Sequence, residues 1–222
     1  RRAYWERTLL QVSDVVIANN AHMGDLLVND FGISPSKIVC LDMFDYLLPP
    51  AQGTANRRID FPIVVAGNLS PHKAGYLSHL PNDIEFNLYG AEYTGSESST
   101  VHYKGAFPPD DLPNEIEGSF GLVWDGPDSS TCSGDFGSYL RINNPHKTSL
   151  YLASELPVLV WSGAAIADFI VSHGLGITVD ALDDIPPKLS SMSIPDYDLL
   201  LQHLTALAPQ PRPAGLTKDA PL

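Results

Sequence analysis

The sequence predicts an α/β protein built on a parallel β-sheet flanked by helices. Short apolar runs alternate with segments of helical periodicity along most of the 222 residues, and this alternation indicates parallel strands joined by crossover helices. Several apolar runs end in glycine or polar residues, as Ala66 does at Gly67 and Trp124 at Asp125. Sheets of this kind bind ligands beyond the carboxyl ends of their strands, so a site is expected at these points.

The first 46 residues predict two helices and two strands, followed by a linker over residues 47–60. The helices are expected at 4–12 and 21–31, and the strands at 15–18 and 38–41. Gly32 stands where a left-handed residue commonly ends a helix. Residues 47–60 have no hydrophobic periodicity and many turn-forming residues, which is typical of a connection between domains.

The alternation restarts after the linker and predicts a second domain over residues 61–206. Its strands are expected at 61–66, 84–88, 101–104, 120–124, 158–161 and 176–179. Its helices are expected up to residue 80 and at 110–117, 145–154, 164–172 and 199–207. A Gly/Ser-rich loop is expected over 127–138, and the Pro/Ala-rich residues 207–222 predict a flexible tail.

Charge narrows the class of partner. The chain holds 13 Lys and Arg against 26 Asp and Glu, a formal net charge of −13. Because phosphate contacts need a basic face, we expect no nucleic-acid partner, whereas a single anionic ligand in a locally basic pocket stays compatible with the charge. The apolar runs are far shorter than the roughly 18 residues of a membrane-spanning helix, so no transmembrane segment is predicted.

The sequence lacks the motifs of several common binding and catalytic sites. Cys40 and Cys132 form no CxxC pair and no metal-ligand spacing, so we expect two incidental thiols and no metal site. No GxGxxG fingerprint is present, and the stretch from Gly90 to Gly95 is followed by Ser96-Glu97 where a P-loop needs Lys and then Ser or Thr. Neither a GxSxG elbow nor an HExxH motif occurs.

The most informative segment runs from Tyr139 to Thr148. Asn144 is a favoured N-cap residue and Pro145 suits the first helical position, so a helix is expected to begin here with free backbone N–H groups. Lys147 in the first turn and Arg141 just before it are cations at a helix end that favours anions. Two interpretations stay open: a phosphate or diphosphate site, or an ordinary capped helix with a solvated lysine.

Other strand ends carry weaker candidates. Tyr89 stands at a strand end, where it either stacks on a base or sugar or packs its ring in the core. Asp125 and Asp128 form either a carboxylate pair or part of a turn. Trp124 and Trp161 are interpreted as core or pocket wall.

Three stretches resemble one family of enzymes. They are Phe120-Gly-Leu-Val-Trp-Asp-Gly126, Tyr139-Leu-Arg-Ile-Asn-Asn-Pro-His-Lys147, and Leu156-Pro-Val-Leu-Val-Trp161 with the following Ala165-Ile-Ala-Asp-Phe-Ile170. They resemble the C-terminal half of bacterial sugar transferases of the GT-B architecture, in particular the glucosyltransferases that extend GlcNAc on serine-rich-repeat adhesins and the β-1,6-galactofuranosyltransferases. Residues 14–17 and 41–47 resemble the end of that family's N-terminal domain.

The resemblance implies a fold and a domain order. Residues 61–206 would form a GT-B-type, Rossmann-like nucleotide-sugar-binding domain. Residues 1–46 would be a truncated remnant of a second Rossmann-like domain on the acceptor side, and the start of the chain without Met, in a helical pattern, suggests a fragment. The expected protein is cytoplasmic or peripheral at the inner membrane face, and similar enzymes self-associate, so a homo-oligomer is expected.

The resemblance also implies a UDP-sugar donor, bound without a metal ion or further cofactor. Carried over by motif, the residues that hold the diphosphate and ribose are Asn143, Asn144, His146 and Lys147. Tyr89 would lie near the uridine, the Gly67-Asn68 turn would face the donor, and Lys73 would add positive charge. The remaining candidates for donor binding are Thr148, Arg141 and Asp125. Lys147 and the helix start would stabilise the leaving diphosphate in place of a metal ion.

One departure from related enzymes limits the mechanism. Many retaining GT-B enzymes carry two paired glutamates, and apolar Ile142 and Leu150 stand near those positions here. No catalytic base is predicted. The expected activity is transfer of a hexosyl group, glucose, GlcNAc or galactofuranose, from a UDP-sugar to a glycan or glycoprotein. The alternatives are a non-catalytic nucleotide-sugar-binding or assembly subunit and a UDP-sugar epimerase.

Overall fold

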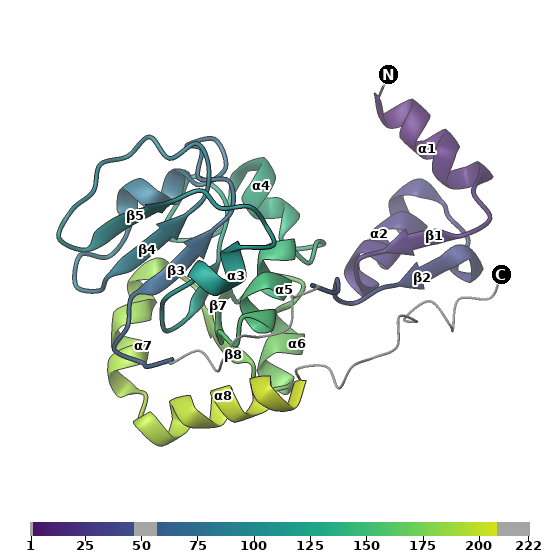
Figure 1. Cartoon of the computed structure of the whole chain (residues 1–222). Coiled ribbons are helices and arrows are strands. Elements are labelled where there is room, and N and C mark those ends of the chain that lie inside the picture. Colours follow the sequence, from purple (N-terminus) through teal and green to yellow (C-terminus); the bar gives the residue numbers. More distant parts are fainter. Residues whose placement is uncertain (1, 47–56, 208–222) are drawn as a thin grey trace.

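A computed structural model describes residues 2–46 and 57–207 (Figure 1). Side chains are described over residues 6–46 and 57–206. The chain forms a small N-terminal unit over residues 2–46 and a larger C-terminal unit over residues 57–207. Most of the predicted linker, 47–56, and almost all of the predicted tail, 208–222, lie outside the described residues. The predicted domain boundaries therefore stay predictions.

The N-terminal unit follows the predicted order closely. It contains α1 (Arg2–Val12), β1 (Val16–Ala18), α2 (Ala21–Phe31), the 3-10 helix η1 (Pro35–Lys37) and β2 (Ile38–Cys40). The two strands pair in parallel. Gly32 has a φ of 68° and closes α2 through its N–H, as the sequence predicts for a left-handed cap. Ile33 follows the cap and is buried in this unit's own small core.

The C-terminal unit is built on a six-stranded sheet in which every pair of neighbours is parallel. Its strands are β3 (Ile63–Ala66), β4 (Phe86–Tyr89), β5 (Val101–Gly105), β6 (Gly121–Val123), β7 (Val158–Trp161) and β8 (Gly176–Val179). All six strands predicted for this domain are present, and the predicted α/β class is confirmed. Their order in the sheet is β5-β4-β3-β6-β7-β8, which is the Rossmann order 3-2-1-4-5-6.

The helices of this unit depart from prediction in several places. They are η2 (Gly75–His79), α3 (Leu112–Glu115), α4 (Gly134–Tyr139), α5 (His146–Ala153), α6 (Ala167–Ser172), η3 (Leu182–Asp184), α7 (Ile185–Ser191) and α8 (Ile194–Leu207). The helix predicted up to residue 80 is a short 3-10 helix, and the loop predicted over 127–138 contains the start of α4. The helix expected at 199–207 begins at Ile194, and α7 has no predicted counterpart.

Helix α5 is tied to the centre of the sheet. The Tyr151 side chain on α5 is fully buried, and its hydroxyl accepts the backbone N–H of Ala66 at the end of β3 (2.7 Å). The ring also lies over Gly121 of β6, where an added Cβ would come within 2.2 Å of it. Glycine at this position therefore lets α5 sit directly on β3 and β6. Helix α5 is therefore positioned by β3 and β6, the two strands between which the strand order reverses.

Candidate functional site

The strand order defines where a ligand can bind. In an open parallel sheet the ligand crevice lies beyond the carboxyl ends of the two strands where the order reverses, here β3 and β6. Gly67-Asn68 follows β3, and Trp124-Asp125 follows β6. The predicted loops after these two strands therefore lie at one edge of the sheet. The start of α5 joins them through the contacts of Lys147.

Lys147 is occupied within the protein. Its Nζ donates to Oδ1 of Asp125 at 2.8 Å and to the carbonyl oxygen of Trp124 at 3.0 Å. The two side chains of the ion pair are only 11% and 7% exposed. Lys147 therefore fastens the first turn of α5 to the end of β6, and its role toward a ligand stays a prediction.

The start of α5 differs from the prediction by one residue. The helix begins at His146, and Pro145 takes the capping position without a side-chain hydrogen bond. Asn144 is therefore not the cap that the sequence predicts, because its side chain forms hydrogen bonds with the N-terminal unit instead. The first N–H groups of α5 receive no side-chain cap, which leaves a helix end suited to an anion.

Asn144 bonds to the N-terminal unit. Its Oδ1 accepts a hydrogen bond from Nδ2 of Asn20 at 2.8 Å, and its own Nδ2 donates to the carbonyl oxygen of Asp42. Asn20 in turn caps α2 by accepting the backbone N–H of Met23 (2.9 Å). Asn20 was not among the predicted site residues. Its position just before the predicted helix at 21–31 is an N-cap signal, but that signal carries no information about Asn144.

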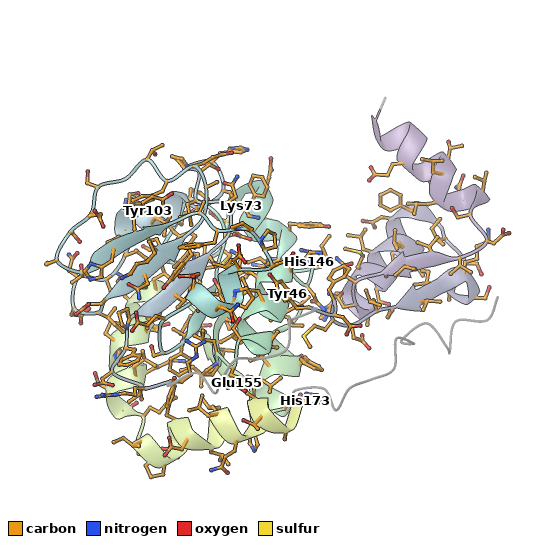
Figure 2. The ribbon with its side chains drawn as sticks, in the orientation of Figure 1. Tyr46, Lys73, Tyr103, His146, Glu155 and His173 are labelled. Carbon is orange, nitrogen blue, oxygen red and sulfur yellow. The ribbon has the colours of Figure 1, made fainter. Side chains whose placement is uncertain are left out.

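Asn143 and His146, on either side of Asn144, also contact the N-terminal unit. Nδ2 of Asn19 donates to Oδ1 of Asn143. The imidazole of His146 stacks on the ring of Phe44, with centroids 4.2 Å apart. Figure 2 shows His146 on the side of the C-terminal unit that faces the N-terminal unit. Three of the four residues predicted to hold the diphosphate and ribose thus contact residues 19–44 in this structure.

The turn after β3 has the space that a ligand needs. Gly67 is exposed with a φ of 130°, and no atom lies within 4 Å of the position of an added Cβ. The Asn68 side chain accepts the N–H of Ser70 at 2.9 Å. Lys73 is half-buried, with Nζ 5.6 Å from the ring centroid of Phe136 on α4. The structure thus keeps Gly67, Asn68 and Lys73 in the loop that follows β3, beside the switch point.

The remaining candidates divide between core and surface. Tyr89 is 2% exposed and its hydroxyl accepts the N–H of Glu117 at 3.0 Å; burial raises the pKa of this hydroxyl. Thr148 is also buried, and its hydroxyl has no hydrogen-bond partner. Arg141 is exposed, with its guanidinium 4.5 Å from the ring centroid of Trp161 at the end of β7. Of these three, Arg141 presents its functional group to solvent.

Two further properties concern the described residues alone. Within residues 2–46 and 57–207, His, Cys, Asp and Glu side chains form no group of three or more that could hold a metal ion. In the same part of the chain, no helix is both long and apolar enough to span a membrane.

Comparison with known proteins identifies the family. The family model described as the C-terminal domain of Glucosyltransferase 3-like proteins matches residues 63–221. This chain belongs to that family. It is 35% identical over 216 residues to the β-1,6-galactofuranosyltransferase WbbI of Escherichia coli K12, covering 95% of this chain and 63% of WbbI. It is 28% identical over 197 residues to Glucosyltransferase 3 of Streptococcus gordonii, covering 86% of this chain and 55% of that protein. The resemblance read from the three sequence stretches is confirmed.

Solved structures show the same fold at low identity. HepE of Anabaena, in complex with UDP, superposes with a TM-score of 0.56 at 16% identity, covering 94% of this chain and 64% of HepE. Sucrose-phosphate synthase of Thermosynechococcus elongatus gives 0.57 at 15% identity, covering 93% and 57%. The chain spans between 55% and 63% of the length of the curated relatives it matches.

Proposed function

We propose that this chain is the donor-binding part of a glycosyltransferase that moves a hexosyl group from a UDP-sugar to a glycan or glycoprotein acceptor. The curated relatives are named galactofuranosyltransferase and glucosyltransferase. HepE, and a mutant of S. aureus TarM with a TM-score of 0.54, were solved with UDP. These names support the reaction class and the nucleotide. Residues 61–206 would bind the donor, and residues 1–46 would belong to the acceptor side.

The observation that carries the proposal is the arrangement at the switch point. The uncapped start of α5, the open Gly67 turn and two cations lie around the carboxyl ends of the strands. Lys73 is half-buried and Arg141 is exposed. In a chain with a net charge of −13, a local group of free N–H donors and cations favours a small anion such as a diphosphate.

The structure changes which cations we assign to the diphosphate. Lys147 is engaged by Asp125 and Trp124, so we assign it to holding α5 in place. Lys73 and Arg141, together with the first N–H groups of α5, would stabilise the charge of the leaving diphosphate electrostatically. Asn68 would border the same turn, and the missing side chain of Gly67 would let phosphate oxygens approach the backbone. In this scheme no metal ion is required.

Calorimetric titration of this chain with UDP, ADP, GDP and NAD tests the proposal. We expect binding of UDP alone, and Lys73→Met or Arg141→Met should each weaken it by about 1.5–3 kcal/mol, or roughly tenfold to 150-fold, as expected for a charge-assisted hydrogen bond. Lys104→Met serves as the matched control, since Lys104 is exposed on the edge strand β5. Equal affinity for all four nucleotides, or no change in either variant, would contradict the assignment.

Activity separates the proposal from its alternatives. The protein at its natural full length should transfer sugar from a UDP-sugar to an acceptor, and Arg141→Met should reduce the transfer. Binding without transfer would indicate a nucleotide-sugar-binding or assembly subunit. Conversion of the sugar without any acceptor would indicate an epimerase.

A further inference from the structure

Four residues form a continuous relay of hydrogen bonds between the two units. The backbone N–H of Met23 donates to Asn20 Oδ1, Asn20 Nδ2 donates to Asn144 Oδ1, and Asn144 Nδ2 donates to the carbonyl oxygen of Asp42. We propose that Asn20 and Asn144 are positioning residues that set the N-terminal unit against the start of α5. Because α5 borders the donor site assigned above, the effect on the donor rests on the proposed function.

Both amides are buried and fully directional. Asn20 is 7% exposed and Asn144 is 4% exposed, so water cannot readily replace a lost partner at either side chain. Each amide has one oxygen acceptor and one nitrogen donor, and each uses both. Turning either amide over would place two donors or two acceptors face to face. The relay therefore favours this arrangement of the two units over arrangements in which one unit is shifted relative to the other.

Adjacent contacts act in the same direction. Asn19 donates to Asn143, and Phe44 stacks on His146. Together with the relay, these contacts link the residues after β1 and those after β2 to three residues around the start of α5, Asn143, Asn144 and His146. A displacement of the N-terminal unit would have to break several of them together.

The relay reaches the helix start through a stiff connection. Pro145 alone separates Asn144 from His146, the first residue of α5, and its ring restricts the backbone there. From the other side, Lys147 fixes the same turn to the end of β6. The free N–H groups at the start of α5 are therefore held between an anchor in the sheet and an anchor in the N-terminal unit. Loss of the contact to the N-terminal unit should let the two units move relative to one another and should make the first turn of α5 more mobile.

Asn20→Asp removes one link of the relay and spares the rest. Aspartate is as good an N-cap as asparagine, so α2 keeps its cap from Met23. A carboxylate has no donor for Asn144, and Asn144 can recover a bond to residue 20 only by abandoning the Asp42 carbonyl. Asn29→Asp is the matched control, because Asn29 is exposed on the same helix and the change in charge is identical.

Distance distributions between spin labels measure the result. The labels are placed at Asp25→Cys on α2 and Gln202→Cys on α8, two exposed positions, in a Cys40→Ser background. We expect one narrow distribution for the parent and for Asn29→Asp, and a broader one for Asn20→Asp. A distribution that stays narrow in Asn20→Asp overturns the relay as the device that sets the two units.

Titration of the same proteins with UDP tests the positioning role. Asn20→Asp should bind UDP roughly threefold to tenfold more weakly than Asn29→Asp. This is the change in affinity expected when the net free energy of one hydrogen bond is lost. Equal affinities would overturn the role toward the donor site. If the parent itself does not bind UDP, the proposed function fails, while the label distances still decide whether the relay sets the two units.

Discussion

The ammonium of Lys147 lies 2.8 Å from a carboxylate oxygen of Asp125, and both side chains are almost wholly buried. Sequence pattern alone presents these residues as a cation at a helix start and an acid at a strand end. In the structure they neutralise one another and join α5 to β6. The charge misfit at the helix start is therefore relieved inside the protein. Lys73, which is half-buried, and Arg141, which is exposed, are the two cations that we propose for the diphosphate.

The first prediction concerns this ion pair. Lys147→Met should lower the free energy of unfolding by about 3–5 kcal/mol, because it leaves the Asp125 carboxylate buried without its partner. Urea denaturation followed by circular dichroism measures the change.

Adding Asp125→Asn to Lys147→Met should restore much of the lost stability, since the unpaired charge is then removed as well. Lys104→Met, at an exposed lysine, should change stability by less than about 0.5 kcal/mol. An equal, large loss in the double variant would show that Lys147 contributes through packing instead of charge.

Two buried tyrosines should respond oppositely to removal of their hydroxyl groups. The Tyr76 hydroxyl is buried without a hydrogen-bond partner, so Tyr76→Phe should be neutral or stabilising. The Tyr151 hydroxyl accepts the N–H of Ala66, so Tyr151→Phe should cost about 1–3 kcal/mol by leaving that donor unsatisfied. Denaturation of the two variants in parallel compares them directly, and a larger loss for Tyr76→Phe would contradict the assignment.

The two thiols should differ in reactivity. Burial raises the pKa of the Cys132 thiol to about 12, while Cys40 is exposed and its pKa is raised more modestly by partial burial and by Asp42 and Asp25. Iodoacetamide at pH 8 should therefore label Cys40, more slowly than a free cysteine, and leave Cys132 unmodified until the protein unfolds. Mass spectrometry of the digested protein identifies the labelled residue.

The raised pKa of the Cys132 thiol should make the protein less stable at alkaline pH. An unfolded cysteine ionises near pH 8.5, whereas native Cys132 keeps its proton to about pH 12. Its contribution is thus complete below pH 8.5 and declines as the pH rises toward 12. Between pH 8 and pH 10 the parent should lose about 2 kcal/mol more than Cys132→Ala; parallel pH profiles would contradict this.

Two glycines at the carboxyl edge should differ in what they tolerate. A Cβ on Gly90 would lie 1.7 Å from the carbonyl oxygen of Gly67, whereas a Cβ on Gly67 would meet no atom within 4 Å. Both have positive φ, so Gly67→Ala should cost about 1–3 kcal/mol in backbone strain and Gly90→Ala distinctly more. Thermal unfolding ranks the two variants. Equal losses would mean that the β3 and β4 turns can separate without cost.

Local pattern predicted the strands better than the helices. Apolar runs of four to six residues are a direct sign of buried strands, and all six in the C-terminal unit were found. Helix α4 contains two glycines and lies in a Gly/Ser-rich segment, so its propensity argues for a loop. The structure gives one of these glycines a tertiary role, because Gly137 packs against the backbone of Cys132 and Asp125, where a side chain would collide. That packing cannot be seen in a local window.

The sequence by itself determined the α/β class, the parallel strands, the strand ends that form the candidate site and, through three short stretches, the family. Only the tertiary structure decided the strand order, the pairing of Lys147 with Asp125, the burial of Tyr89 and the bonds from Asn144 to the N-terminal unit. The physical reason is range. Periodicity, caps and turns follow from neighbours a few residues apart, whereas residues 20 and 144 meet across 124 positions of chain, and their partners are set by packing.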